Sequence, residues 1–294
     1  MSIKARVGNA LLYLLAAAGL FPAAVLGQQA DSASKSQTVR CAVIGGMHDT
    51  GLWPAVGERF EKATGHKVEM IARGPKHDIV GSFVAGEADL ITMHASDTIV
   101  NLVADGYGID PQPWAKNDLL LVGPPSDPAG IRGEKDAIAA LRKIAATKSK
   151  LLLHASLGAS EVLSDVLAAG KTEIDPAQLL SLPSDKHREM LKKAQDAGAY
   201  TLVGRIPYLN AKIEKHDMQI MVQGDPRLRR PYLVVVANVD NKADPRHAAA
   251  KQLAAFLRST ETQAWLTEFG RGKLDDQPLF FPVKMTRPGA ATAP

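Results

Sequence analysis

The sequence has a single cysteine, few aromatic residues and no excess of one charge sign. With Cys41 as the only thiol, no disulfide can form within the chain. Aromatic residues make up only 5% of the 294 residues, which argues against a surface that stacks sugars or single-stranded nucleic acid. The formal charge is +4, and the one tight basic cluster, Arg227-Leu-Arg-Arg230, is too small for a nucleic-acid interface. We therefore expect a globular α/β protein without a nucleic-acid partner.

The N-terminus has the pattern of a secretory signal peptide, residues 1–27. Lys4 and Arg6 precede the apolar run Ala10–Leu20, and a proline follows this run. Cleavage would leave residues 28–38 as a polar linker before the first strand. The alternative, an uncleaved membrane anchor, has nearly the length needed to cross a bilayer, but the proline and the polar residues after the cut favour cleavage. The sequence thus predicts export to the periplasm.

Strand and helix signals alternate along the mature chain. The predicted strands are 40–45, 67–72, 88–93, 117–123, 150–154, 199–203 and 232–237. The predicted helices are 51–64, 76–85, 97–105, 134–148, 160–169, 186–197, 245–259 and 262–269. Such alternation indicates parallel βαβ units in a doubly wound sheet.

Two crossings of the chain, near 116–124 and 225–240, predict two lobes. Lobe 1 would contain residues 39–115 plus 240–294, and lobe 2 residues 116–239. A cleft between two lobes is a favoured place for a small ligand.

Several segments match a known family in order and spacing. They include Asp49-Thr-Gly-Leu52, Phe60-Glu-Lys-Ala-Thr-Gly-His-Lys-Val68, Gly86-Glu-Ala-Asp-Leu-Ile-Thr-Met-His-Ala95, Gly198-Ala-Tyr-Thr-Leu202 and Leu279-Phe-Phe-Pro282. Together they resemble the periplasmic tungstate-binding proteins of ABC transporters. This resemblance implies a two-lobed type II periplasmic-binding-protein fold of the α/β class, each lobe a mixed, mostly parallel sheet flanked by helices. It also implies capture of a small tungstate- or molybdate-like oxyanion and its delivery to an ABC permease in the inner membrane. We expect a monomer with no enzymatic activity and no cofactor.

The loops that hold the ligand in that family match less well. The turn Gly45-Gly-Met-His48 replaces a Thr/Ser-rich turn, and Gly74-Pro-Lys-His77 replaces Gly-Thr-Gly-Gln. In lobe 2, His154-Ala-Ser-Leu-Gly-Ala-Ser160 aligns with Arg-Gly-Asp-Asp-Ser-Gly-Thr, so histidine stands in place of arginine. The predicted ligand site consists of Gly46, Met47, His48, Lys76, His77, His154, Ser160 and Arg205.

These residues have both ligand-binding and structural interpretations. Backbone N–H groups, the Ser160 hydroxyl and the Arg205 guanidinium are donors that an oxyanion needs. The alternatives are a helix N-cap for Ser160 and a solvated surface arginine for Arg205.

Three histidines leave the ligand class open. Imidazoles of His48, His77 and His154 could surround an anion, ligate a transition metal, or lie exposed without a ligand. We assign no metal, because no close spacing such as His-x-x-x-His occurs. If His154 faces an oxyanion, the affinity should fall as the pH rises through about 6 to 8.

Two other function classes are a sensor or adaptor domain and a hydrolase. A binding domain that has lost transport could act as a sensor or adaptor. Hydrolysis is disfavoured, because a nucleophile elbow around Ser156 would need glycine where His154 stands.

Overall fold

The computed structural model describes residues 35–153, 157–182, 187–209, 216–273, 276 and 278–284. The chain divides into two units, Met1–Lys35 and Ser36–Pro294, and the fold below is that of the second unit. The predicted signal peptide and residues 28–34 of the predicted linker lie outside the described residues. No helix within the described ranges combines the length and the apolar composition needed to cross a bilayer.

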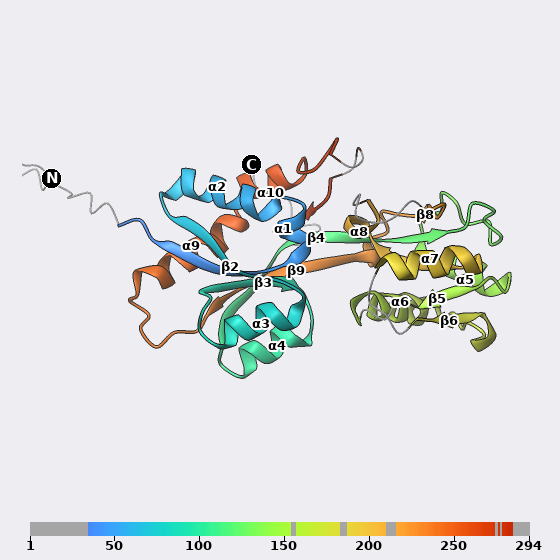
Figure 1. Ribbon diagram of the computed structural model, residues 1–294, viewed down its shortest axis with the longest axis horizontal. Helices are drawn as coiled ribbons and strands as arrows, with labels where there is room; N and C mark the ends of the chain where they lie inside the picture. The colour runs from blue at the N-terminus through green and yellow to red at the C-terminus, as the bar shows by residue number, and fades with distance from the viewer. Residues whose placement is uncertain are drawn as a thin grey trace, which may run out of the picture. The chain divides into compact units, whose positions relative to one another are not determined.

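Lobe 1 is built on a sheet with strand order β2-β1-β3-β9-β4 (Figure 1). Strand β1 runs parallel to β2 and β3, whereas β9 is antiparallel to β3 and β4, and β10 adds to β4. The strands are β1 (Thr38–Ile44), β2 (Lys67–Gly74), β3 (Leu90–His94), β4 (Gly108–Gly123), β9 (Arg229–Ala237) and β10 (Phe281–Pro282).

Helices cover both faces of this sheet, because successive strand residues point to opposite sides. Cys41 of β1 packs in a core with α1, α2, α9 and α10, while its neighbour Ala42 packs in a second core with α3 and α4. The helices are α1 (Gly45–Asp49), α2 (Leu52–Thr64), α3 (Lys76–Val84), α4 (Asp97–Ala104), α9 (Pro245–Leu257) and α10 (Thr260–Leu266).

Lobe 2 uses the C-terminal part of β4 as a strand of its own sheet, with β7 on one side and β8 on the other. Strands β7 and β8 pair antiparallel with β4, and β5 pairs parallel with β7 and β6. Helices α5 and α6 pack on one face and α7 on the other. The elements are α5 (Ala137–Ala146), β5 (Leu151–Leu153), α6 (Leu157–Gly170), η1 (Pro176–Gln178), β6 (Leu179–Ser181), α7 (His187–Ala197), β7 (Tyr200–Gly204), α8 (Arg205–Leu209), β8 (Gln219–Val222) and η2 (Pro226–Leu228).

The chain passes between the lobes twice. Within β4, residues up to Asp118 pair with β9, and residues from Leu119 onward pair with β7 and β8. On the return, Leu228 packs in the lobe 2 core, and Arg229 pairs with Asp118 at the start of β9. The expectation of two α/β lobes is confirmed. We expected lobe 2 to extend to residue 239, yet β9 pairs with β3 and so lies in the lobe 1 sheet.

Two local expectations differ from the structure. The turn Gly45-Gly-Met-His48 is the start of the short helix α1. The segment before Asn117, for which we predicted no strand, is the first half of β4.

Candidate functional site

A hollow of about 500 Å³ lies between α4 of lobe 1 and α6 of lobe 2. Its lining comes from the N-terminal end of α4 and from one face along the first turns of α6. N–H groups in the first turn of a helix lack partners within the helix and attract anions. The lining residues are Ser96, Asp97, Ser160, Glu161, Ser164 and Asp165.

Lys76 reaches this hollow from the first position of α3. Its Nζ donates a hydrogen bond to the Ser96 hydroxyl at 3.1 Å. Ser96 is the N-cap residue of α4, but its side chain makes no capping hydrogen bond. Lys76 forms no ion pair with any described carboxylate, so its positive charge remains available beside the N-terminal end of α4.

Arg230 brings a second positive charge to the lobe junction. It lies on β9 opposite Asn117, yet its guanidinium packs against Gly158 in the first turn of α6. Burial lowers the pKa of Arg230 from its ordinary value, and Tyr232 and Glu161 only partly offset this effect. An arginine nevertheless stays protonated at neutral pH, so the junction carries a permanent charge.

His94 is the last residue of β3. Its ring stacks on Tyr232 with the centroids 4.1 Å apart. Burial lowers the pKa of His94 well below its ordinary value, and the charges of Arg230 and Lys76 lower it further. His94 is therefore neutral near pH 7, and the charges of both Lys76 and Arg230 act on this ring.

Comparison with known proteins assigns the family. The sequence pattern of the bacterial extracellular solute-binding proteins matches residues 42–271 of this chain. The chain belongs to this family. A tungstate-binding protein, TupA, of Peptoclostridium acidaminophilum is 28% identical over 238 residues, which cover 80% of this chain and 82% of that protein.

Solved structures confirm the fold of this solute-binding protein. The tungstate-binding protein TupA from Desulfovibrio alaskensis G20 matches with a TM-score of 0.70 and 24% identity, over 84% of this chain and 99% of that chain. The tungstate ABC transporter structure from Geobacter sulfurreducens matches with a TM-score of 0.64 and 24% identity, over 79% and 98% of the two chains. These likenesses confirm the periplasmic-binding-protein architecture predicted from the sequence.

The solute-binding protein brings only some of the predicted site residues to the hollow. Ser160 lines it and Lys76 contacts its wall through Ser96. His154 lies outside the described residues. Arg205 is only 2% exposed at the start of α8, where its Nε lies 3.9 Å from Asp118 and its Nη2 donates to Gln223 at 2.7 Å.

The predicted residues on α1 and α3 have different surroundings. The Met47 side chain is fully buried in the lobe 1 core, so only its backbone could face a ligand. Helix α1 turns this side chain inward and leaves Gly46 partly exposed with open space around it. The His48 ring accepts a hydrogen bond from Arg73 at 2.9 Å. The His77 side chain is 80% exposed and lies 3.1 Å from Asp78.

The sequence analysis missed Arg230, Ser96 and Gly158. The sequence signal for Arg230 is the basic cluster Arg227-Leu-Arg-Arg230, which is too small for a nucleic-acid interface but places a cation at the start of β9. Within the described ranges, no group of three His, Cys, Asp or Glu side chains is placed to hold a metal ion.

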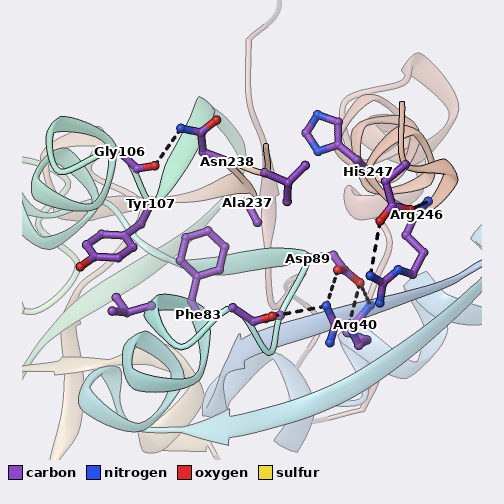
Figure 2. Close-up of a pocket in the computed structure, with 14 residues that line it drawn as sticks. Arg40, Phe83, Asp89, Gly106, Tyr107, Ala237, Asn238, Arg246 and His247 are labelled. Carbon is purple, nitrogen blue, oxygen red and sulfur yellow. Dashed lines mark hydrogen bonds and ion pairs between the residues drawn. The ribbon is translucent and has the colours of Figure 1, made fainter. Parts of the chain in front are cut away.

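A second hollow, of about 240 Å³, lies in lobe 1 away from α6 (Figure 2). Its cations are paired: Arg40 binds Asp89 at 2.7 Å, and Arg246 lies 3.4 Å from Asp244. Burial lowers the pKa of His247, which also lines this hollow. The second hollow thus offers an anion no unpaired charge, in contrast to the lobe junction.

Proposed function

We propose that this solute-binding protein is exported, binds a small tetrahedral oxyanion of the tungstate or molybdate type between its lobes, and delivers it to an ABC permease. One observation carries the proposal. Lys76 lies beside the N-terminal end of α4 and Arg230 beside the N-terminal end of α6, and neither forms an ion pair with a described carboxylate. The names of the relatives, which include tungstate-binding proteins, support the choice of ligand.

The proposed mechanism is closure of the lobes around the anion. Lys76 and Ser96 belong to lobe 1, and Ser160 belongs to lobe 2. A ligand that touches both sets stabilises the closed form over the open form. Each charge-assisted hydrogen bond contributes about 1.5–3 kcal/mol, so two or three of them suffice to shift this equilibrium. Asp97, Glu161 and Asp165, which also line the hollow, oppose the anion and limit its affinity.

The ligand is tested by calorimetry on the mature protein with tungstate, molybdate, sulfate, phosphate, Zn²⁺ and Ni²⁺. We expect heat from tungstate and molybdate and none from the metal ions. Lys76→Met should weaken tungstate binding by about tenfold or more. The matched control Lys62→Met, an exposed lysine of α2, should leave it unchanged. Binding of Zn²⁺ or Ni²⁺ without any oxyanion would favour the histidine-lined metal site instead.

Export is tested separately. The intact mass of protein recovered from the periplasm should correspond to a chain that begins at Gln28, and elemental analysis should detect bound tungsten or molybdenum. A mass that includes residues 1–27 would contradict cleavage.

A further inference from the structure

Arg230 has no hydrogen bond or ion pair with any residue in the part of the chain that the structure describes. It is nevertheless half-buried at the lobe junction. A desolvated charge is costly unless a group of opposite charge accompanies it. Glu161 acts on Arg230 at a distance but forms no ion pair with it. A bound anion would supply the opposite charge that this guanidinium lacks among the described residues.

Gly158 supplies the space that Arg230 occupies. A Cβ atom on Gly158 would overlap the guanidinium, including Nη1 at 2.6 Å. Gly158 has no positive φ, so its backbone conformation does not require glycine. Glycine is also a poor helix former, yet it stands in the first turn of α6. The contact with Arg230 explains this choice of residue.

We infer that Arg230 is the permanent cationic ligand of the bound anion, that Gly158 positions it, and that Arg230 and Lys76 together make the site select dianions. This inference rests on the proposed function and names the charge of its substrate. Arg230 takes over the charge that the arginine aligned with His154 would supply, and it does so from β9 of lobe 1 rather than from position 154.

Two cations distinguish a dianion from a monoanion of the same shape. Each additional charge on the ligand interacts with both Lys76 and Arg230, in a junction where water screens the charges incompletely. Tungstate and perrhenate are tetrahedral and nearly equal in size, but they carry two charges and one charge. The site should bind tungstate at least about tenfold more tightly than perrhenate, which is about 1.4 kcal/mol.

The test measures tungstate and perrhenate affinities by calorimetry at pH 6 and pH 8. The proteins are the mature parent chain and the variants Arg230→Gln, Arg230→Lys and Gly158→Ala. Arg227→Gln is the control for the arginine, since Arg227 pairs with Asp225 and Asp136 instead of facing the hollow. Gly81→Ala is the control for the glycine, because a Cβ there meets no atom within 4 Å. Circular dichroism confirms that each variant is folded.

We expect Arg230→Gln to weaken tungstate binding about 10- to 100-fold and to reduce the preference over perrhenate. Arg230→Lys should retain part of the tungstate affinity and part of the preference over perrhenate. Gly158→Ala should weaken tungstate binding in the parent but not in the Arg230→Gln background, because it acts by displacing the guanidinium. The parent affinity should be nearly the same at pH 6 and pH 8, since arginine does not titrate there.

Several outcomes would overturn the inference. One is a parent that binds tungstate while Arg230→Gln binds it equally well and still discriminates against perrhenate. A second is that Gly158→Ala weakens tungstate binding equally in the parent and in the Arg230→Gln variant. A third is an affinity that falls steeply from pH 6 to pH 8, which would assign the charge to His154. A parent that binds no oxyanion would instead contradict the proposed function itself.

Discussion

Replacing Tyr200 by phenylalanine tests the packing of lobe 2. The Tyr200 ring is fully buried, its hydroxyl donates to Asp127 at 2.7 Å, and the hydroxyl accepts the Ala129 N–H at 2.9 Å. The change removes a hydrogen bond to a carboxylate and leaves a buried N–H without an acceptor. These two losses together should lower the free energy of unfolding by about 2–3 kcal/mol. For a protein of this size, the Tm should fall by about 4–12 °C.

This prediction also has a pH dependence. Burial opposes ionisation of Asp127, but hydrogen bonds from Tyr200 and from the backbone N–H groups of Arg132 and Ile131 outweigh it and lower the pKa. A lowered pKa stabilises the fold above the ordinary value, and this contribution is lost as the pH falls through the lowered value. The difference between parent and Tyr200→Phe should therefore shrink below about pH 4.

The assay is urea-induced unfolding at pH 7 and pH 3.5, followed by circular dichroism. Tyr107→Phe is the matched control, because Tyr107 is 43% exposed and its hydroxyl has no hydrogen-bond partner among the described residues. The control should change the stability by less than about 0.5 kcal/mol. If Tyr200→Phe and Tyr107→Phe both changed the free energy of unfolding at pH 7 by the same small amount, the reasoning would be refuted.

Three further predictions follow from single contacts. Gly123→Ala should destabilise the protein by about 1–3 kcal/mol, since a Cβ would overlap the Tyr200 ring. Gly81→Ala in α3 should instead stabilise it by about 0.5–1 kcal/mol. Chemical unfolding measures both free energies, and a Gly123→Ala variant more stable than Gly81→Ala would contradict the packing. Asp165→Asn should raise tungstate affinity about twofold at low salt, because it removes a negative charge that lines the hollow, and should have no effect at high salt. Titrations at two ionic strengths measure this. A lower affinity of the variant would mean that the Asp165 carboxylate helps binding. Burial raises the pKa of the Cys41 thiol, so a thiol reagent should label the protein only after unfolding, and rapid labelling of the native protein would contradict the buried strand.

The regular elements of the fold could be predicted because local patterns determine them. The helix that begins at Lys76 follows a Gly-Pro pair, and its apolar residues recur at helical spacing. The first half of β4 escaped prediction because Pro111 and Pro113 break the strand signal. In the structure, register shifts between Ile109 and Gln112 and between Pro113 and Ala115 accommodate these prolines against β9.

The site was harder to predict because its charges come together only through tertiary contacts. Lys76 and Ser160 could be inferred from loops aligned with a family pattern. Arg230 and Gly158 are 72 positions apart in the chain, and no local periodicity connects them. The inward side chain of Met47 likewise depends on the short helix α1, which a glycine-rich turn does not indicate.

The central claim is that an oxyanion binds between the lobes beside Lys76 and Arg230. A crystal of the mature protein grown with tungstate tests it most directly, because anomalous scattering locates tungsten without any assumption about its ligands. The account predicts one tungsten peak within hydrogen-bonding distance of the Arg230 guanidinium and the first turn of α6. A peak in the lobe 1 hollow beside Arg40 and His247, or no peak at all from protein that binds tungstate in solution, would contradict it.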